Sequence, residues 1–182
     1  MKMKAHLKTA AMAVALIWIV FLVDTILPLD LRHLGIRPRH LGGLIGIPLA
    51  PLLHGSLNHI IANTGALFVL LLLTLAAAPR QAASAIAVIV FLGGVMVWLF
   101  GSGRTVHIGA SGLIFGLIGF LVCIGLFRKE WTALAISLLV LVLYGGALMS
   151  LLIAAPGISW SGHFFGFLSG VLAAWWMRGD KR

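Results

Sequence analysis

The stretch Gly109-Ala110-Ser111-Gly112-Leu113-Ile114-Phe115-Gly116 is the part of the sequence from which the rest of the chain is best interpreted. It places one hydroxyl group between small residues, directly after the polar segment 101–107 and directly before an apolar run. This pattern predicts a serine at the beginning of a membrane-embedded helix, where backbone N–H groups are unpaired and the helix dipole favours negative charge. Such a position suits a nucleophile with part of an oxyanion site beside it.

The glycines of this stretch allow a second interpretation. Gly112, Gly116 and Gly119 recur at spacings of four and three residues. Small residues with this spacing usually let two transmembrane helices approach each other closely. Taken alone, the stretch favours helix packing over catalysis, and the rest of the chain reverses that preference.

The composition indicates a polytopic membrane protein. Of the 182 residues, 62% are hydrophobic and 9% are charged, which is more apolar surface than a soluble domain of this size could bury. The net charge of +9 is therefore interpreted as a topology signal, and no nucleic-acid partner is expected. The single Cys123 lies in an apolar run, which excludes a disulfide framework and a cysteine metal motif.

Six apolar runs are compared with the roughly 20 residues that crossing a bilayer core requires, and the fourth and sixth of them are short. They predict an all-α polytopic membrane protein, a six-helix bundle forming a single membrane-embedded domain over residues 1–182. The expected transmembrane helices cover residues 10–29, 60–78, 82–101, 111–127, 131–153 and 162–177. The basic N-terminal segment resembles a signal peptide but shows no clear cleavage site, so the first helix is expected to be retained.

Lysine and arginine predict the orientation of this bundle. Nine of the 13 fall on the same side as the N-terminus and four on the other, so both termini are expected in the cytoplasm. Three of those four lie in the first connection, which runs from about Asp30 to Asn58 and mixes glycine and proline with apolar residues. This composition predicts a structured lobe that dips partly into the membrane.

Polar side chains gather at the beginnings of the second, fourth and sixth predicted helices. His59 and Asn63 lie four residues apart and share a helix face, and His163 begins the sixth helix. The topology puts them with Ser111 at the outer membrane face, at similar depth. A neutral imidazole is the usual base for a serine, and Asn63, His59 and the backbone N–H of Ser111 could bind the developing oxyanion.

The acidic residues lie elsewhere in the sequence, so the predicted chemistry is a Ser–His dyad. Asn63 could instead serve as an interhelical hydrogen-bonding residue. His54 is expected to be structural, joining the first loop to the second helix. A zinc site formed by His54, His59 and His163 is a further alternative, although no carboxylate lies near it. Four other histidines lie in loops or at interfaces and are expected to be solvated: His6, His33, His40 and His107.

Three ordered motifs resemble the rhomboid family of intramembrane serine proteases, of the compact bacterial type. They are His54-x4-His59-x3-Asn63, Gly109-Ala110-Ser111-Gly112 and His163-x2-Gly166-x3-Gly170. The resemblance covers essentially the whole chain. It implies an integral protein of the bacterial inner membrane that cleaves transmembrane protein substrates near the outer membrane face, within the lipid bilayer and without a metal or other cofactor.

By position, the resemblance implies Ser111 as the nucleophile and His163 as the base. Asn63, His59 and Gly109 would contribute to the oxyanion site. The main alternative is a non-catalytic rhomboid-like protein that binds client transmembrane helices in the same groove. A small-molecule transporter would be expected to show internal repeats or broken helices in both halves, and the sequence shows neither.

Overall fold

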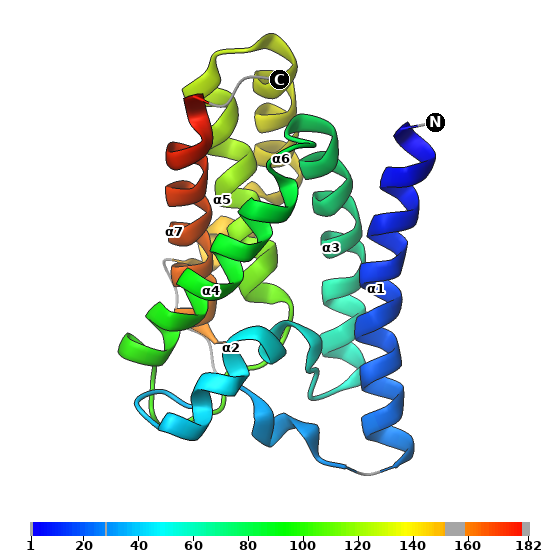
Figure 1. Ribbon diagram of the computed structural model, residues 1–182, viewed down its shortest axis with the longest axis vertical. Coiled ribbons are helices and arrows are strands. Elements are labelled where there is room, and N and C mark those ends of the chain that lie inside the picture. The colour runs from blue at the N-terminus through cyan, green and yellow to red at the C-terminus, as the bar shows by residue number, and fades with distance from the viewer. Residues whose placement is uncertain (1, 28, 152–158, 180–182) are drawn as a thin grey trace.

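The computed structural model describes residues 2–27, 29–151 and 159–179. Within these ranges the chain is helical and no β-strand forms. Six helices are long: α1 (Lys2–Ile26), α3 (Leu57–Ala77), α4 (Ala82–Phe100), α5 (Ser111–Arg128), α6 (Trp131–Leu148) and α7 (Trp160–Trp176) (Figure 1). The first five are long and apolar enough to cross a membrane, whereas α7 has 17 residues. The predicted all-α polytopic membrane fold is confirmed.

The observed helices differ from the expected ranges mainly at their ends. Helix α1 begins at Lys2 rather than at residue 10, because lysines avoid the hydrocarbon core but do not prevent a helix from forming. Helix α6 ends at Leu148 and continues as a 3-10 turn, η4 (Met149–Leu151). Helix α7 begins at Trp160, directly after the capping residue Ser159. The remaining expected end of the fifth helix, 152–153, lies outside the described residues.

The first connection forms the structured lobe that its composition predicts. It contains η1 (Leu31–Leu34), η2 (Leu41–Ile45), α2 (Gly46–Leu49) and η3 (Ala50–Leu52). The lobe packs on α4, since Ile36, Ile47 and Ala50 form a small buried cluster with Val97. A Cβ atom at Gly94 of α4 would lie 2.7 Å from the Ile47 side chain, so the two segments are in close contact.

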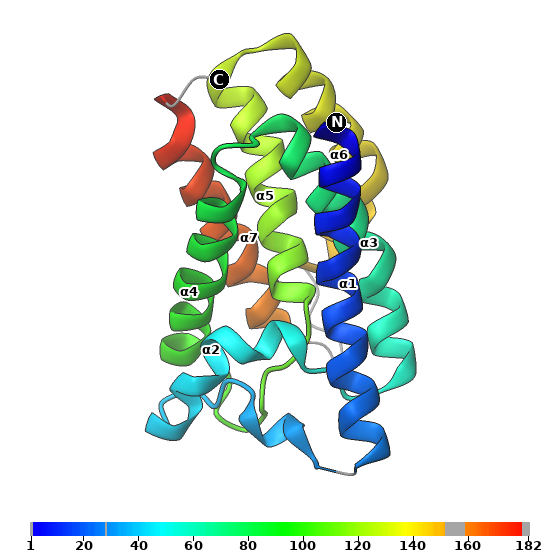
Figure 2. The same ribbon diagram turned by 45° about the vertical axis from the view of Figure 1, so that its right-hand side comes forward.

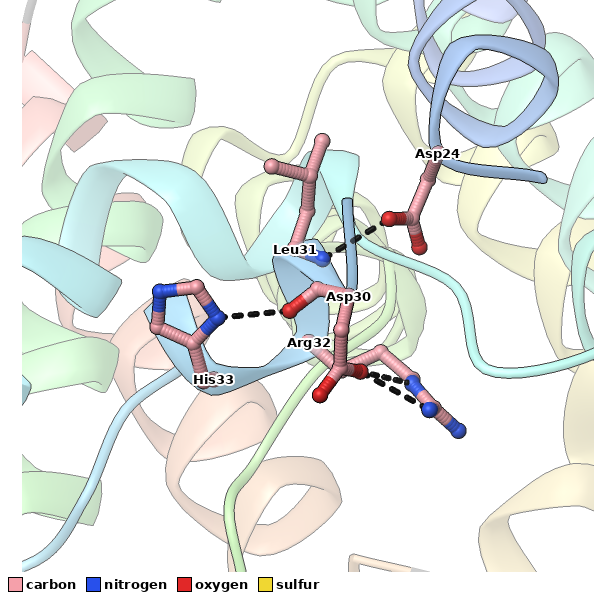
Figure 3. A network of polar contacts seen from close by, with 5 residues as sticks. All are labelled: Asp24, Asp30, Leu31, Arg32 and His33. Carbon is pink, nitrogen blue, oxygen red and sulfur yellow. Dashed lines mark hydrogen bonds and ion pairs between the residues drawn. The ribbon is translucent and has the colours of Figure 1, made fainter. Parts of the chain in front are cut away.

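A local polar network holds the turn between α1 and this lobe (Figure 3). The carboxylate of Asp24 accepts a hydrogen bond of 2.7 Å from the backbone N–H of Leu31. Asp30 adopts a left-handed conformation with φ of 49° and forms an ion pair of 2.8 Å with Arg32. Nδ1 of His33 donates to the carbonyl oxygen of Asp30 at 2.6 Å. Both acidic side chains of this region therefore have partners inside the turn.

The lobe and the beginnings of three helices lie at the same end of the bundle. Figures 1 and 2 show the start of α1 and the end of α7 at one end, and α2 at the opposite end. Helices α3, α5 and α7 all begin at the α2 end. This arrangement brings the first turns of the second, fourth and sixth long helices close to the lobe.

Glycines bring α5 and α7 into backbone contact at the centre of the bundle. A Cβ atom at Gly166 would collide with the carbonyl oxygen of Gly112, and one at Gly170 would collide with that of Gly116. Only glycine fits at such a crossing, as in other closely packed transmembrane helix pairs. The glycine pattern around Ser111 therefore serves helix packing, and the same packing carries Ser111 and the first turn of α7 side by side.

Candidate active site

A cavity of about 690 Å³ lies at the lobe end of the bundle, between α3, α5, α6 and α7. Four of the residues that the sequence singles out line it together: Ser111, His163, Asn63 and His59. They come from three helices that are distant in the sequence, and each lies in the first two turns of its helix. Gly109 and His54 lie beside the cavity, in contact with these residues.

Ser111 is the first residue of α5, and Gly109 controls how the chain reaches it. Gly109 has φ of +110°, a conformation that other residues rarely adopt, and its N–H donates to the carbonyl of Ala50 at 2.8 Å. A Cβ atom at this position would lie 2.5 Å from Nε2 of His59. The loop thus needs glycine both for its backbone angle and for the space that the His59 ring occupies.

His54 fastens the same loop to the lobe. Its Nδ1 lies 3.3 Å from the carbonyl oxygen of Leu52, and its Nε2 accepts a hydrogen bond of 3.4 Å from the N–H of Ala110. Because a carbonyl can only accept, Nδ1 carries the proton and Nε2 is free to accept. Burial, and secondly the charge of neighbouring His59, lowers the pKa of His54 from 6.5 to about 4, so the ring is neutral.

This contact differs in detail from the expected one. The sequence suggested that His54 joins the first loop to the second helix, whereas its ring bonds to the lobe at Leu52 and to Ala110, directly before Ser111. Ala110 is 56 residues away from His54 in the chain, and the spacing of motifs alone does not reveal a contact between them.

His163 is held by stacking on an aromatic ring. It lies in the first turn of α7, and its ring stacks on Phe115 with centroids 4.1 Å apart and planes inclined by 13°. Phe115 follows Ser111 by one helical turn, so the stack keeps the imidazole beside the helix that carries the serine. Nδ1 of His163 is buried and has no hydrogen-bond partner among the described residues, so no carboxylate bonds to this nitrogen there.

Asn63 presents an unpaired hydrogen-bond donor to the cavity. The side chain is 5% exposed, and its Nδ2 has no hydrogen-bond partner in the described part of the chain. Leaving such a donor unpaired costs about 1–3 kcal/mol, so an amide placed this way is a candidate for binding an acceptor that enters the cavity. A structural interhelical hydrogen bond, the alternative for Asn63, is therefore absent from its Nδ2.

His107 is a residue whose importance the sequence analysis missed. The prediction that it is solvated is wrong, because only 6% of it is exposed. Its backbone forms an isolated bridge with Ile36 in the lobe, and its Nδ1 lies 2.7 Å from the hydroxyl of Ser159. The only sequence signal is its position four residues before Ser111. Residues 154–158, shortly before Ser159, lie outside the described residues.

Metal binding was the competing interpretation of His54, His59 and His163. Within residues 2–27, 29–151 and 159–179, no group of three or more His, Cys, Asp or Glu side chains is arranged to hold a metal ion. The first two rings instead contact each other edge to face, with centroids 5.0 Å apart.

Fold and cavity together define a polytopic helical membrane protein with a serine and a histidine in one cavity. The sequence profile of the Rhomboid domain matches residues 39–180, which is most of the chain. The protein therefore belongs to the rhomboid family, and the resemblance seen in its motifs is confirmed. Members of this family are generally intramembrane serine proteases.

Relatives from mycobacteria are similar over nearly the whole chain. The uncharacterized protein Rv1337 of Mycobacterium tuberculosis is 45% identical over 179 residues, covering 93% of this chain and 74% of the relative. The uncharacterized protein ML1171 of Mycobacterium leprae is 40% identical over 177 residues, covering 92% and 70%. A protein of Bacillus subtilis named "Putative rhomboid protease YdcA" is 31% identical over 126 residues, covering 66% and 61%.

Proposed function

We propose that this protein is an intramembrane serine endopeptidase that cleaves transmembrane protein substrates near the outer membrane face with a Ser–His dyad. The observation that carries the proposal is one cavity lined by Ser111, His163 and the unpaired amide donor of Asn63. The 182 residues act as one membrane-embedded domain. Membership of the rhomboid family supports this reaction class.

In the proposed reaction, Oγ of Ser111 attacks the carbonyl carbon of the scissile peptide bond while His163 accepts the hydroxyl proton. The carbonyl oxygen becomes an oxyanion and is bound by Nδ2 of Asn63, by His59 and by the backbone N–H of Ser111, with Gly109 shaping this part of the site. His163 then gives its proton to the leaving amine. Water hydrolyses the acyl-enzyme by the same two proton transfers in reverse order.

The His163 ring suits this role because it is positioned without a carboxylate. Stacking on Phe115 fixes the plane of the imidazole and leaves its nitrogens free of ion pairs among the described residues. The acidic residues nearest in the topology, Asp24 and Asp30, have partners in the turn after α1. A dyad is therefore the chemistry that the surrounding residues support.

Substrate class follows from the site's depth. A peptide bond inside a helix is already hydrogen-bonded and sterically covered, so the substrate must unwind locally before Ser111 can attack it. Transmembrane segments that contain glycine, proline or small polar residues unwind at least cost and are the expected substrates. Water reaches Ser111 through the cavity, whose lining includes polar groups from α3, α7 and the loop before α5.

The proposed orientation places both termini in the cytoplasm of a bacterial cell and the cavity toward the outer face of the inner membrane. Basic residues support it, since nine of the 13 lysines and arginines fall on the cytoplasmic side of this topology. The start of α1 and the end of α7 lie at the bundle end opposite the lobe, as such a topology requires (Figure 1).

Labelling with a fluorophosphonate serine probe tests the proposal directly. The native protein in detergent should be labelled, whereas Ser111→Ala and His163→Ala should not be. Asn63→Ala should lower the labelling rate by about 10²–10³, the usual effect of losing one oxyanion donor. Ser150→Ala is the matched control, because among the described residues its hydroxyl bonds to the carbonyl of Ala147 alone, away from the cavity lining.

Two results would contradict the proposal. Labelling that survives in Ser111→Ala would identify a different nucleophile. A folded native protein that takes up no probe, and whose Ser111→Ala variant still binds client transmembrane helices, would support the non-catalytic alternative.

A further inference from the structure

A hydrogen bond joins the two segments that precede the proposed dyad. His107 lies four residues before Ser111, and Ser159 lies four residues before His163. Nδ1 of His107 is 2.7 Å from Oγ of Ser159, although the two residues are 52 positions apart. Neither side chain has a role in the chemistry proposed above.

The partners of His107 determine the direction of this bond. Nε2 of His107 lies 3.2 Å from the carbonyl oxygen of Ser102, which can only accept, so Nε2 carries the ring proton. Nδ1 is then an acceptor, and the hydroxyl of Ser159 donates to it. Burial lowers the pKa of His107 below its usual value of 6.5, which keeps the ring in this neutral form.

Ser159 also holds the first turn of α7. Its hydroxyl accepts a hydrogen bond of 3.2 Å from the N–H of Gly162, and its carbonyl accepts one of 3.1 Å from the N–H of His163. The hydroxyl therefore donates to His107 and accepts from Gly162 at the same time. Hydrogen bonds in such a chain polarise and strengthen one another.

His107, the other partner of this hydrogen bond, is also held firmly by its backbone. The backbone of His107 exchanges two hydrogen bonds with Ile36, of 3.0 and 2.9 Å, so the residue is anchored to the buried part of the lobe. Two residues later, Gly109 donates to Ala50 of the lobe. The loop before Ser111 is thus attached to the lobe through its backbone and to α7 through one side-chain bond.

We propose that His107 is a positioning residue: through Ser159 it sets the placement of His163 relative to Ser111. This inference rests on the proposed function. The glycine contacts between α5 and α7 fix the helix axes, whereas the His107–Ser159 bond fixes the two segments that lead into the reactive residues. An imidazole misplaced by a fraction of an ångström accepts the serine proton less efficiently.

Two substitutions of His107 separate its two side-chain contacts. In His107→Asn, Oδ1 occupies the place of Nδ1 and can still accept from Ser159, but the contact to Ser102 is lost. In His107→Gln, the longer amide can reach Ser102 but leaves Ser159 without its acceptor. We expect the probe to label His107→Gln about tenfold more slowly than the native protein and His107→Asn within about threefold of it, in line with one hydrogen bond.

Ser159 provides the reciprocal test. Ser159→Ala should slow labelling at least as much as His107→Gln, because it removes the bond to His107 and also the cap to the N–H of Gly162. Ser159→Thr should label near the native rate, because threonine keeps both the hydroxyl and the helix cap. The double variant His107→Gln/Ser159→Ala should label no more slowly than Ser159→Ala alone, since Ser159→Ala already removes the bond that His107→Gln removes. A general loss of stability would instead make the two effects multiply.

The ring tautomer gives a second measurement that does not depend on activity. Nitrogen-15 NMR of histidine-labelled protein should show a neutral ring protonated at Nε2, with an Nδ1 signal that shifts in Ser159→Ala. Equal labelling rates for the Asn and Gln variants, or an Nδ1-protonated ring, would overturn the positioning role. A native protein that the probe does not label would overturn the proposed protease activity and leave the NMR result to judge the bond itself.

Discussion

Helices α5 and α6 are neighbours of equal length, yet they are packed very differently. Each has 18 residues, and both are apolar. Ten residues of α5 are buried, whereas α6 buries three, namely Ala133, Ser137 and Val140. Hydrophobicity alone does not separate them, because in a bilayer both lipid and protein can cover an apolar side chain.

The closest contacts of α6 lie near its beginning. Near its beginning, the hydroxyl of Ser137 donates to the carbonyl of Leu121 at 2.7 Å, and a Cβ atom at Gly125 of α5 would collide with Ser137. Near its other end, Gly145 and Gly146 have open space around them, since a Cβ atom at either would meet nothing within 4 Å. That loosely packed end lies at the cavity, which Tyr144 and Ala147 help to line.

This difference shows how one small bundle can hold one side of a cavity by close packing and leave the other side loosely packed. Ser111 and His163 stand on the helices that cross with backbone contact, so their relative position is set by close packing. The α6 wall of the cavity lacks such contacts. Regions with few buried contacts open at the lowest free-energy cost, so the α6 side of the cavity should open more readily than the α5–α7 side.

The largest expected effect comes from overfilling the α5–α7 contact. In Gly170→Ala the new methyl group would strike the carbonyl oxygen of Gly116, and neither backbone can move without separating the helices. We expect a loss of about 1–3 kcal/mol or more in the free energy of unfolding and the disappearance of probe labelling. Unfolding in mixed detergent micelles and the labelling rate measure both. Normal labelling of this variant would show that the helices are not in backbone contact.

Acidification should produce the next largest effect, through His54. The folded-state pKa of about 4 lies below the usual 6.5, so the unfolded chain binds a proton at a pH where the folded chain does not. The stabilisation is complete above pH 6.5 and is lost as the pH falls toward 4. The free energy of unfolding, measured against pH, should fall less steeply in His54→Gln. Identical slopes would show that folding does not lower the pKa of His54.

A smaller effect is expected from replacing Phe115, whose ring stacks on His163. Phe115→Leu keeps an apolar side chain of similar size but removes the stacking partner of the imidazole. Such aromatic pairs contribute about 0.5–1.5 kcal/mol, so the labelling rate should fall by roughly two- to tenfold while the protein stays folded. Phe115→Tyr, which keeps the ring, is the matched control and should label like the native protein. Equal losses in both variants would contradict a stacking role.

The sequence predicted these helices well because each crossing needs one long apolar run and there are few ways to arrange six of them. The same topology explains why Ser111, His163, Asn63 and His59 could be predicted to meet. Because consecutive helices cross the membrane in opposite directions, the beginnings of alternate helices lie at one membrane face. No contact between specific side chains was needed for that inference.

The features that the sequence could not reveal are contacts between loop segments that are distant in the chain. The burial of His107 follows from a backbone bridge to Ile36 and a bond to Ser159, at separations that no local pattern encodes. The partner of His54 before Ser111 was hidden for the same reason. The overall apolarity of α6 gave no sign of its loose packing, because its buried neighbour α5 is about equally apolar. Only the spaced glycines of α5 indicated that this helix packs more closely.

The smallest effect is expected where α6 is loosely packed. Gly145→Ala adds the same methyl group as Gly170→Ala, but into open space, so it should change the free energy of unfolding by at most about 1 kcal/mol. The sign should be stabilising, because alanine favours a helix more than glycine does. Labelling should proceed at the native rate, since a side chain at Gly145 would touch neither Ser111 nor His163. A loss comparable to that of Gly170→Ala would mean that this end of α6 packs as tightly as α5, and the contrast between the two helices would fail.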